Sequence, residues 1–258
     1  MFTRSVTEQE RSAVSKDELE QAASIERWLR NWVARLAIPR SRLYEPRANR
    51  RVEQDIAQAL SDMGYQVTVV GSMRNIVAIP PGGSRSRTLI GAHFDSVPNS
   101  PGADDNASGV AALLRCADET QRAGIPTVFV AFNAEEEGLV GSREFVASGL
   151  CADLGVRDAH VLEMVGYRAR GKDSQWAPKG LSSFVPRTGD FIGLIANSPS
   201  RVPLARALGA AKTGTSPAVR TLEVFFGLER QFGDLLRSDH APLWSAGIPT
   251  VLWTDTAE

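Results

Sequence analysis

Hydrophobic positions recur along this chain with two different spacings. In some segments they return every three or four residues, the pattern of an amphipathic helix, and in others they alternate or form short β-branched runs, which is typical of strands. The first pattern predicts helices at 16–37, 49–63, 110–123, 141–148, 200–211 and 241–244. The second predicts strands at 65–70, 75–79, 87–92, 126–132, 158–165, 190–195, 219–226 and 247–252.

Strands and helices alternate over most of the chain. This order favours a central sheet of mostly parallel strands with helices on both faces. We therefore expect a single three-layer α/β domain with a twisted sheet over residues 16–258, because no internal repeat or linker indicates a second domain. Residues 1–15 are polar and are predicted to be disordered.

The overall composition is that of an ordinary globular protein. Of the 258 residues, 43% are hydrophobic and 23% are charged, and the formal net charge is −1. No basic block indicates nucleic acid as a partner, and no apolar run reaches the roughly 18 residues of a membrane span. The amino terminus lacks the apolar core of a secretory signal, and two cysteines make no disulfide framework. These features predict a cytoplasmic protein with no membrane partner.

The first candidate chemistry lies between Gly91 and Gly109, which read GAHFDSVPNSPGADDNASG. His93 and Asp95 stand two apart at the end of a predicted strand, so they project from the same face. Such a pair is either a metal ligand with its orienting partner or an ordinary hydrogen-bonded pair. Asp104 and Asp105 follow in a loop, where adjacent carboxylates repel each other unless a cation binds them. A cation site is therefore favoured over a solvated acidic turn.

Two later strands also end in acidic residues. Glu135, Glu136 and Glu137 follow the predicted strand at 126–132, and in isolation they suit a solvated helix start equally well. Glu163 stands inside an otherwise apolar run. A glutamate is seldom buried unless it is paired or binds a metal, so Glu163 adds to the case for a cation site.

Side chains of metal-ligand type thus lie at strand ends or in the adjoining loops. They are His93, Asp104, Glu136, Glu163 and His240. Mixed nitrogen and oxygen ligands suit zinc, with cobalt or manganese as alternatives. The set exceeds the three protein ligands of one catalytic zinc, and a carboxylate that bridges two ions accounts for the excess. We assign Asp104 as the bridge and Glu135 as the base in a metal-assisted hydrolysis of an acyl bond.

Five motifs in this order resemble those of the co-catalytic zinc exopeptidases, the family of the bacterial leucyl aminopeptidases and glutamate carboxypeptidase II. The motifs are GAHFDS, PGADDNASG, FNAEEEGLVGS, VLEMVGY and SDHAPLWSAGIP. The resemblance spans residues 49–256. It implies the zinc-exopeptidase fold, which is phosphorylase/hydrolase-like, two Zn²⁺ ions and a peptide substrate.

The resemblance also implies a role for each matching ligand. His93 and Glu163 hold one zinc ion, Glu136 and His240 hold the other, and Asp104 bridges the two.

Two further residues are implied to be catalytic. Glu135 is the general acid/base, and Asp95 orients the histidine two residues before it. A cis peptide bond is implied after the bridging aspartate, between Asp104 and Asp105.

The chain departs from the family pattern at two points. Glu163 stands where the well-studied aminopeptidases have aspartate, which leaves the choice between aminopeptidase and carboxypeptidase open. The chain ends at Glu258, where relatives continue into a further stretch, so a domain truncated at its carboxyl end is one interpretation.

Three functions fit these residues. The first is an aminopeptidase that hydrolyses the N-terminal peptide bond. The second is a glutaminyl-cyclase-like acyltransferase with one zinc ion, although relatives of that kind lack the Asp-Asp-Asn run at 104–106. The third is a non-catalytic binding domain, which the retention of all five ligands and Glu135 disfavours. The native metal, the side-chain preference and the oligomeric state are left open.

Overall fold

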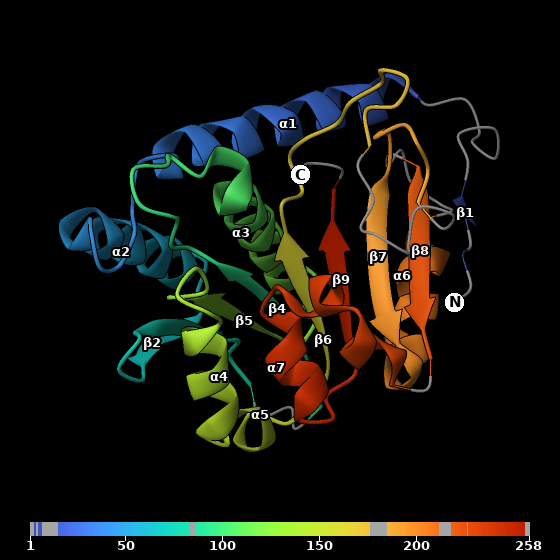
Figure 1. Cartoon of the computed structure of the whole chain (residues 1–258). Helices are drawn as coiled ribbons and strands as arrows, with labels where there is room; N and C mark the ends of the chain where they lie inside the picture. Colours follow the sequence, from blue (N-terminus) through green and yellow to red (C-terminus); the bar gives the residue numbers. More distant parts are fainter. Residues whose placement is uncertain are drawn as a thin grey trace.

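The structure is a computed structural model that describes residues 3, 5–6, 15–82, 86–175, 185–211, 218–225 and 227–255. Its centre is a nine-stranded sheet with the strand order β1-β8-β7-β9-β6-β4-β5-β3-β2 (Figure 1). The strands are β1 (Ser5–Val6), β2 (Gln66–Val70), β3 (Asn75–Ile79), β4 (Arg87–His93), β5 (Thr127–Phe132), β6 (Val156–Glu163), β7 (Ile192–Asn197), β8 (Val219–Val224) and β9 (Thr250–Thr254).

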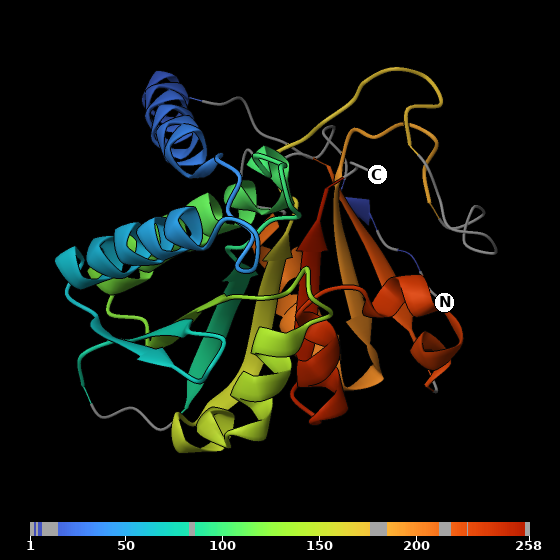
Figure 2. The ribbon, with the colours of Figure 1, turned by 60° about the vertical axis from the view of Figure 1, so that its left-hand side comes forward.

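Helices cover both faces of the sheet (Figures 1 and 2). On one face lie α2 (Pro46–Asp62), α3 (Gly109–Arg122) and α6 (Arg201–Ala211), and α1 (Lys16–Leu36) packs outside α3. On the other face lie α4 (Val140–Ala147), α5 (Leu150–Asp153) and α7 (His240–Ser245). The remaining turns are η2 (Ala103–Ser108), η3 (Ser198–Ser200), η4 (Leu228–Gln231) and η5 (Gly233–Leu236). The predicted three-layer α/β architecture is confirmed.

Strand β5 shows why the sheet needs helices on both sides. All six of its residues are buried. Because successive side chains point to opposite faces, Phe129 and Ala131 join the core beneath α2 and α3, whereas Val128 and Val130 join the core beneath α4 and α7. A strand that is buried on both faces has a continuous run of apolar residues in its sequence. The sequence TVFVAF of β5 has this pattern.

The register of the central strands brings the predicted site residues to one edge. Strands β5, β4, β6 and β9 are mutually parallel, so their carboxyl ends meet there. Gly91 of β4 pairs with Val161 of β6, and each stands two residues before the end of its strand. His93 and Glu163 therefore reach the same level and project from the same face.

Some predicted boundaries are wrong. Strand β6 runs from Val156 to Glu163, so Glu163 ends this strand rather than lying inside it. Helix α2 begins at Pro46, three residues before the predicted start, because proline is well suited to the first turn of a helix. The four-residue helix α5 was not predicted.

The amino-terminal region is only partly described. Within residues 1–15, predicted to be disordered, Ser5–Val6 form β1 and pair with β8 through the backbone. The Ser15 side chain caps α1 by accepting a hydrogen bond from the Glu18 amide. Backbone pairing to a sheet edge requires no apolar pattern, which is why β1 left no signal in the sequence. Residues 1–2, 4 and 7–14 lie outside the described part of the chain.

Two further observations concern the length of the apolar helices and the state of the cysteines. Among the described residues, no helix combines the length and apolar character needed to cross a lipid bilayer. Cys116 and Cys151 are free thiols, as expected from the absence of a disulfide framework.

A buried pair of amides joins α2 to the end of β5. The Asn49 and Asn133 side chains exchange hydrogen bonds of 3.0 and 3.1 Å, and Asn133 also donates to the Met73 carbonyl at 2.9 Å. We expect Asn133→Ala to lower the free energy of unfolding by about 1–3 kcal/mol, because it leaves buried polar groups unpaired. Urea unfolding monitored by circular dichroism measures this change. The control is Gln58→Ala on the exposed side of α2, for which a change within about 0.5 kcal/mol is expected; equal effects of the two variants would contradict the prediction.

Candidate metal centre

Three strand ends supply the centre of the site. His93 ends β4, Glu163 ends β6, and Glu135 lies in the turn after β5. Each of these residues offers one ligand atom, and the three atoms lie within 4.8 Å of one another. Open α/β sheets bind their ligands at the carboxyl ends of the strands. At this edge of the sheet, nitrogen and oxygen donors lie close together.

The surroundings of the His93 ring fit a cation. Its Nε2 atom lies 3.2 Å from Glu163 Oε1 and 3.1 Å from Asp105 Oδ1. One ring nitrogen carries at most one proton, so it cannot serve both oxygens equally well, and Asp105 Oδ1 has no well-aligned hydrogen-bond partner among the described residues. A divalent ion between these three atoms satisfies all of them. The imidazole and carboxylate donors are those that suit zinc.

The carboxylate of Asp95 holds the histidine strand to the glutamate turn. It accepts hydrogen bonds from the backbone N–H groups of Glu135 and Glu136, at 3.1 and 3.2 Å. Its Oδ1 also lies 3.4 Å from Nδ1 of His93. The side chain is buried, so it has a fixed place between the two segments. Its role in orienting His93 stays a prediction, because Nδ1 has no well-aligned hydrogen-bond partner among the described residues.

The two adjacent aspartates have different surroundings. The Asp105 carboxylate lies beside His93, whereas Asp104 Oδ1 accepts a hydrogen bond of 2.9 Å from the Gly166 amide, away from the cluster. The prediction of a cis peptide between Asp104 and Asp105 is also wrong, since the cis bond joins Asp105 and Asn106. Asp104 Oδ1 thus helps to hold the loop after β6, whereas Asp104 Oδ2 is buried with no hydrogen-bond partner among the described residues. The bridging role expected of Asp104 stays a prediction, and Asp105 is the aspartate that lies beside His93.

Asn106 explains how this segment is held. Its side chain donates to the Leu162 carbonyl of β6 at 2.8 Å and accepts from the Gly109 and Met164 amides, at 3.0 and 3.1 Å. One buried amide therefore ties η2 to both α3 and β6. The same side chain satisfies the first backbone amide of α3.

Burial and like charges shape the electrostatics of the site. Burial raises the pKa of Glu135 to about 9, and burial with the nearby Asp105 raises the pKa of Glu136 to about 7. Burial acts to lower the pKa of His93, yet the surrounding carboxylates, Glu163 foremost, raise it well above the ordinary value. Each shift is one that a bound cation opposes.

Glu136 stands beside this cluster. Its Oε1 accepts a hydrogen bond of 3.1 Å from the Val97 amide. The predicted ligand role of Glu136 is compatible with this contact, because a carboxylate oxygen can accept a second partner, but it stays a prediction.

Next to this glutamate, Glu137 turns away and pairs with the Arg42 guanidinium. It takes no part in the cluster.

The segment before α7 contributes two residues that the sequence pattern did not single out. The Ser238 hydroxyl donates to Glu163 Oε2 at 2.8 Å. Asp239 is fully buried, and neither of its carboxylate oxygens has a hydrogen-bond partner among the described residues. Burial raises the pKa of Asp239 to about 7. Their adjacency to His240 was the only available signal, and it did not reveal these contacts.

The structure does not bring His240 into the cluster. Its Nε2 lies 2.8 Å from the Leu235 carbonyl, and its ring packs edge-on against Trp244 with the centroids 4.5 Å apart. Because a carbonyl only accepts hydrogen bonds, Nε2 carries the proton and Nδ1 retains the lone pair. Burial lowers the pKa of His240 to about 4, so the ring is neutral. Its role as a ligand stays a prediction.

The structure places His160 apart from the site. Its Nδ1 accepts a hydrogen bond of 2.9 Å from the Trp253 indole. His160 thus packs against Trp253 and has a structural role.

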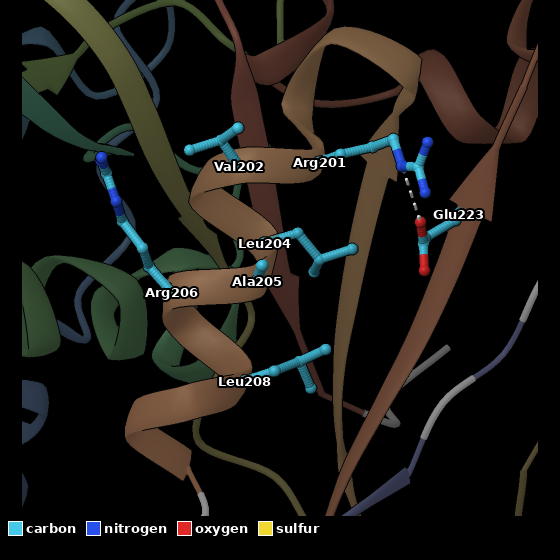
Figure 3. A pocket seen from close by; sticks show the side chains of 7 residues that line it. All are labelled: Arg201, Val202, Leu204, Ala205, Arg206, Leu208 and Glu223. Atoms are coloured by element: carbon cyan, nitrogen blue, oxygen red, sulfur yellow. Dashed lines mark ion pairs between the residues drawn. The ribbon is translucent and has the colours of Figure 1, made fainter.

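A separate pocket lies beside α6, on the far part of the sheet (Figure 3). It has a volume of about 480 Å³ and an apolar lining that includes Val202, Leu204 and Leu208. At its rim Arg201 Nε lies 3.9 Å from Glu223 Oε2. No residue of the histidine and carboxylate cluster lines this pocket, so it is not the metal centre.

Fold and cluster together define the kind of site. His93 and Glu163 at strand ends, with Asp105 and Glu135 in the adjoining loops, form a candidate metal centre at the carboxyl edge of an α/β sheet. Comparison with known families gives the closer identification: the profile of Peptidase family M28 matches residues 75–258, and the chain belongs to this family. The resemblance to the co-catalytic zinc exopeptidases is thereby confirmed.

Curated relatives include peptidases and an uncharacterized protein. YfbL of Escherichia coli is 30% identical over 205 residues, which cover 72% of this chain and 61% of that protein. This chain thus spans less than two thirds of that relative. Aminopeptidase YwaD of Bacillus subtilis is 48% identical over 59 residues, which cover 21% of this chain and 12% of the relative.

Solved structures share the fold. LapA aminopeptidase of Legionella pneumophila matches 96% of this chain and 67% of its own length, with a TM-score of 0.65 and 18% identity. A glutaminyl cyclase of Bacteroides thetaiotaomicron matches 92% of this chain and 85% of its own length, with a TM-score of 0.59 and 18% identity. At these identities the likeness shows the fold alone.

The two aspartates provide a direct test of the site. We expect Asp105→Asn to weaken zinc binding by at least the roughly 10–100-fold typical of residues that only orient a ligand. Asp104→Asn, the matched control, should leave zinc affinity nearly unchanged, because its carboxylate contacts the Gly166 amide. Competition with a chromophoric chelator measures both affinities. Loss of zinc from Asp104→Asn but not from Asp105→Asn would restore the original assignment.

Proposed function

We propose that this protein is a metal-dependent aminopeptidase that hydrolyses the N-terminal peptide bond of peptides. The observation that carries the proposal is the convergence of His93, Asp105, Glu135 and Glu163 at one edge of the sheet. Membership of Peptidase family M28 supports peptide substrates, and aminopeptidases among the relatives support the amino-terminal specificity.

The donor set fits two zinc ions. We assign His93 and Glu163 to one ion, Glu136 and His240 to the other, and Asp105 as the shared carboxylate. Zinc bound in such a site polarises the scissile carbonyl and lowers the pKa of water. The assignment of Glu136 and His240 rests on the family resemblance. For the other ion, His93 already contacts both Asp105 and Glu163.

Glu135 is the proton carrier in this proposal. Its carboxylate takes the proton of the attacking water and passes it to the nitrogen of the leaving amine, which balances the hydrolysis. Asp95 keeps the turn that bears Glu135 in place through the two backbone N–H groups that it accepts. A cation at His93 and Glu163 lowers the pKa of Glu135, which opposes the effect of burial and prepares it as a base.

The second candidate is a glutaminyl-cyclase-like acyltransferase. The solved cyclase with a TM-score of 0.59 keeps this candidate open, because one fold supports both chemistries. In that reaction the amine of an N-terminal glutamine attacks its own side-chain amide, and ammonia leaves.

Removal of the proposed base tests the mechanism. We expect Glu135→Gln to keep its bound zinc and its fold while kcat falls by about 2–4 orders of magnitude, as is typical when a general acid–base is removed. Steady-state hydrolysis of leucine p-nitroanilide, with metal content measured on the same sample, provides the data. The neighbouring Glu137→Gln is the control and should keep its turnover, since Glu137 pairs with Arg42. Undiminished turnover in Glu135→Gln, with a large loss in Glu137→Gln, would move the base to Glu137.

A substrate panel distinguishes the two candidate reactions. We expect about two zinc ions per chain and hydrolysis of aminoacyl substrates with a free amine, since two ions share one bridging carboxylate in this proposal. Acetylation of the amine should abolish most of the activity. Elemental analysis and mass spectrometry of the products measure these outcomes. One zinc ion per chain, with ring closure of N-terminal glutamine and loss of ammonia, would favour the cyclase instead.

A further inference from the structure

Arg40 is a fully buried arginine in the connection between α1 and α2. Its side-chain nitrogens donate only to backbone carbonyls among the described residues. The acceptors and distances are Phe94 O at 2.6 Å, Pro101 O at 2.5 Å, Gly102 O at 2.9 Å, Leu36 O at 3.1 Å and Ile38 O at 3.2 Å. A guanidinium with so many neutral partners is a structural clamp rather than half of an ion pair.

Two of the clamped segments carry residues of the metal centre. Phe94 lies between His93 and Asp95, and its carbonyl accepts from Arg40 Nε. Pro101 and Gly102 lead directly into η2, which carries Asp105. One side chain therefore spans the two segments whose His93 Nε2 and Asp105 Oδ1 lie 3.1 Å apart.

Gly102 shows how closely the loop folds around this clamp. It has a φ of 51°, in the left-handed region, and a Cβ added there would stand 2.2 Å from the Asp105 carbonyl oxygen. The same Cβ would stand 3.1 Å from Arg40 Nη1. The backbone of Asp105, the turn at Gly102 and the guanidinium are thus closely packed, and a side chain larger than hydrogen does not fit at position 102 in this arrangement.

The charge of Arg40 also faces the acidic edge of the sheet. Burial lowers its pKa to about 10, and the charges of Asp95, Asp105 and Glu136 oppose this change, so it remains protonated at neutral pH. Because Arg40 donates its hydrogen bonds to backbone carbonyls, it does not occupy the carboxylate oxygens of Asp95, Asp105 and Glu136. A fixed positive charge therefore lies near the ligands without occupying them.

We propose that Arg40 is a positioning residue of the metal centre, which holds His93 and Asp105 at the separation that metal binding needs. It touches neither substrate nor the reacting atoms, and it acts through the backbone on either side of the two ligands. The effect on metal affinity stands independently of which reaction the site performs. Only the effect on turnover rests on the proposed aminopeptidase function.

The test replaces Arg40 by lysine and by alanine. Lysine keeps the charge but has a single nitrogen with three donors, which cannot span carbonyls on several segments as the planar guanidinium does. We expect Arg40→Lys to bind zinc about 10–100-fold more weakly, as is typical when a residue that orients metal ligands is lost. In Arg40→Ala, added guanidine should recover part of the affinity. Chelator competition measures the affinity, and the visible absorption of the cobalt-substituted protein reports the ligand geometry.

Arg87 provides the matched control at the other end of β4. It is similarly buried and donates to the Leu154 carbonyl at 2.8 Å and the Gly82 carbonyl at 3.4 Å, far from the strand end that carries His93. Arg87→Lys should lower the melting temperature without changing zinc affinity or the cobalt spectrum. A purely structural role of Arg40 predicts the same behaviour for Arg40→Lys.

The outcomes separate this inference from the proposed function. Weaker zinc binding and an altered cobalt spectrum in Arg40→Lys, with Arg87→Lys unchanged, support the positioning role even if no peptide is hydrolysed. Zinc affinity equal to that of the unaltered protein overturns it, whatever the activity. An Arg40→Lys chain that no longer unfolds cooperatively also overturns it, because Arg40 would then serve the fold as a whole.

Discussion

The carboxyl edge of the central sheet gathers several carboxyl groups, most of them partly or fully buried. Burial raises the pKa of Glu135 to about 9 and those of Glu136 and Asp239 to about 7. Carboxylates crowded in this way favour their protonated forms unless a cation lies among them. The strand ends, the turn after β5 and the loop that bears Asp105 are arranged so that a cation can lie among these carboxylates.

The groups that hold these residues in place are mostly bonded to the backbone. Asp95 accepts from two amides of the glutamate turn, Asn106 ties η2 to β6 and α3, and Arg40 clamps the segments on either side of the metal ligands. Such contacts restrict the positions of the ligand side chains while leaving most of their lone pairs free. The scaffold is therefore polar, buried and largely satisfied, which is what a site of defined geometry requires.

The fold is compatible with more than one reaction. An aminopeptidase and a glutaminyl cyclase both superimpose on this chain over more than nine tenths of its length. What distinguishes candidate reactions is local: the number of ions that the donors hold, and whether Glu135 activates water or an amine of the substrate. In the proposed function the number of ions depends on Asp105, the carboxylate beside His93 that we assign as shared between two ions.

The sequence by itself determined most of the element order and the mostly parallel sheet, and it identified residues that the structure brings together at one edge, because apolar periodicity and the position of polar residues after strands are local signals. His93, Glu135 and Glu163 were identified in this way. Only the tertiary structure showed that Asp105 rather than Asp104 lies beside His93, since adjacent residues of the same type differ only in where the folded backbone points them. It likewise revealed Arg40, whose partners lie up to 62 residues away, because no local pattern records which distant carbonyls a buried side chain will meet.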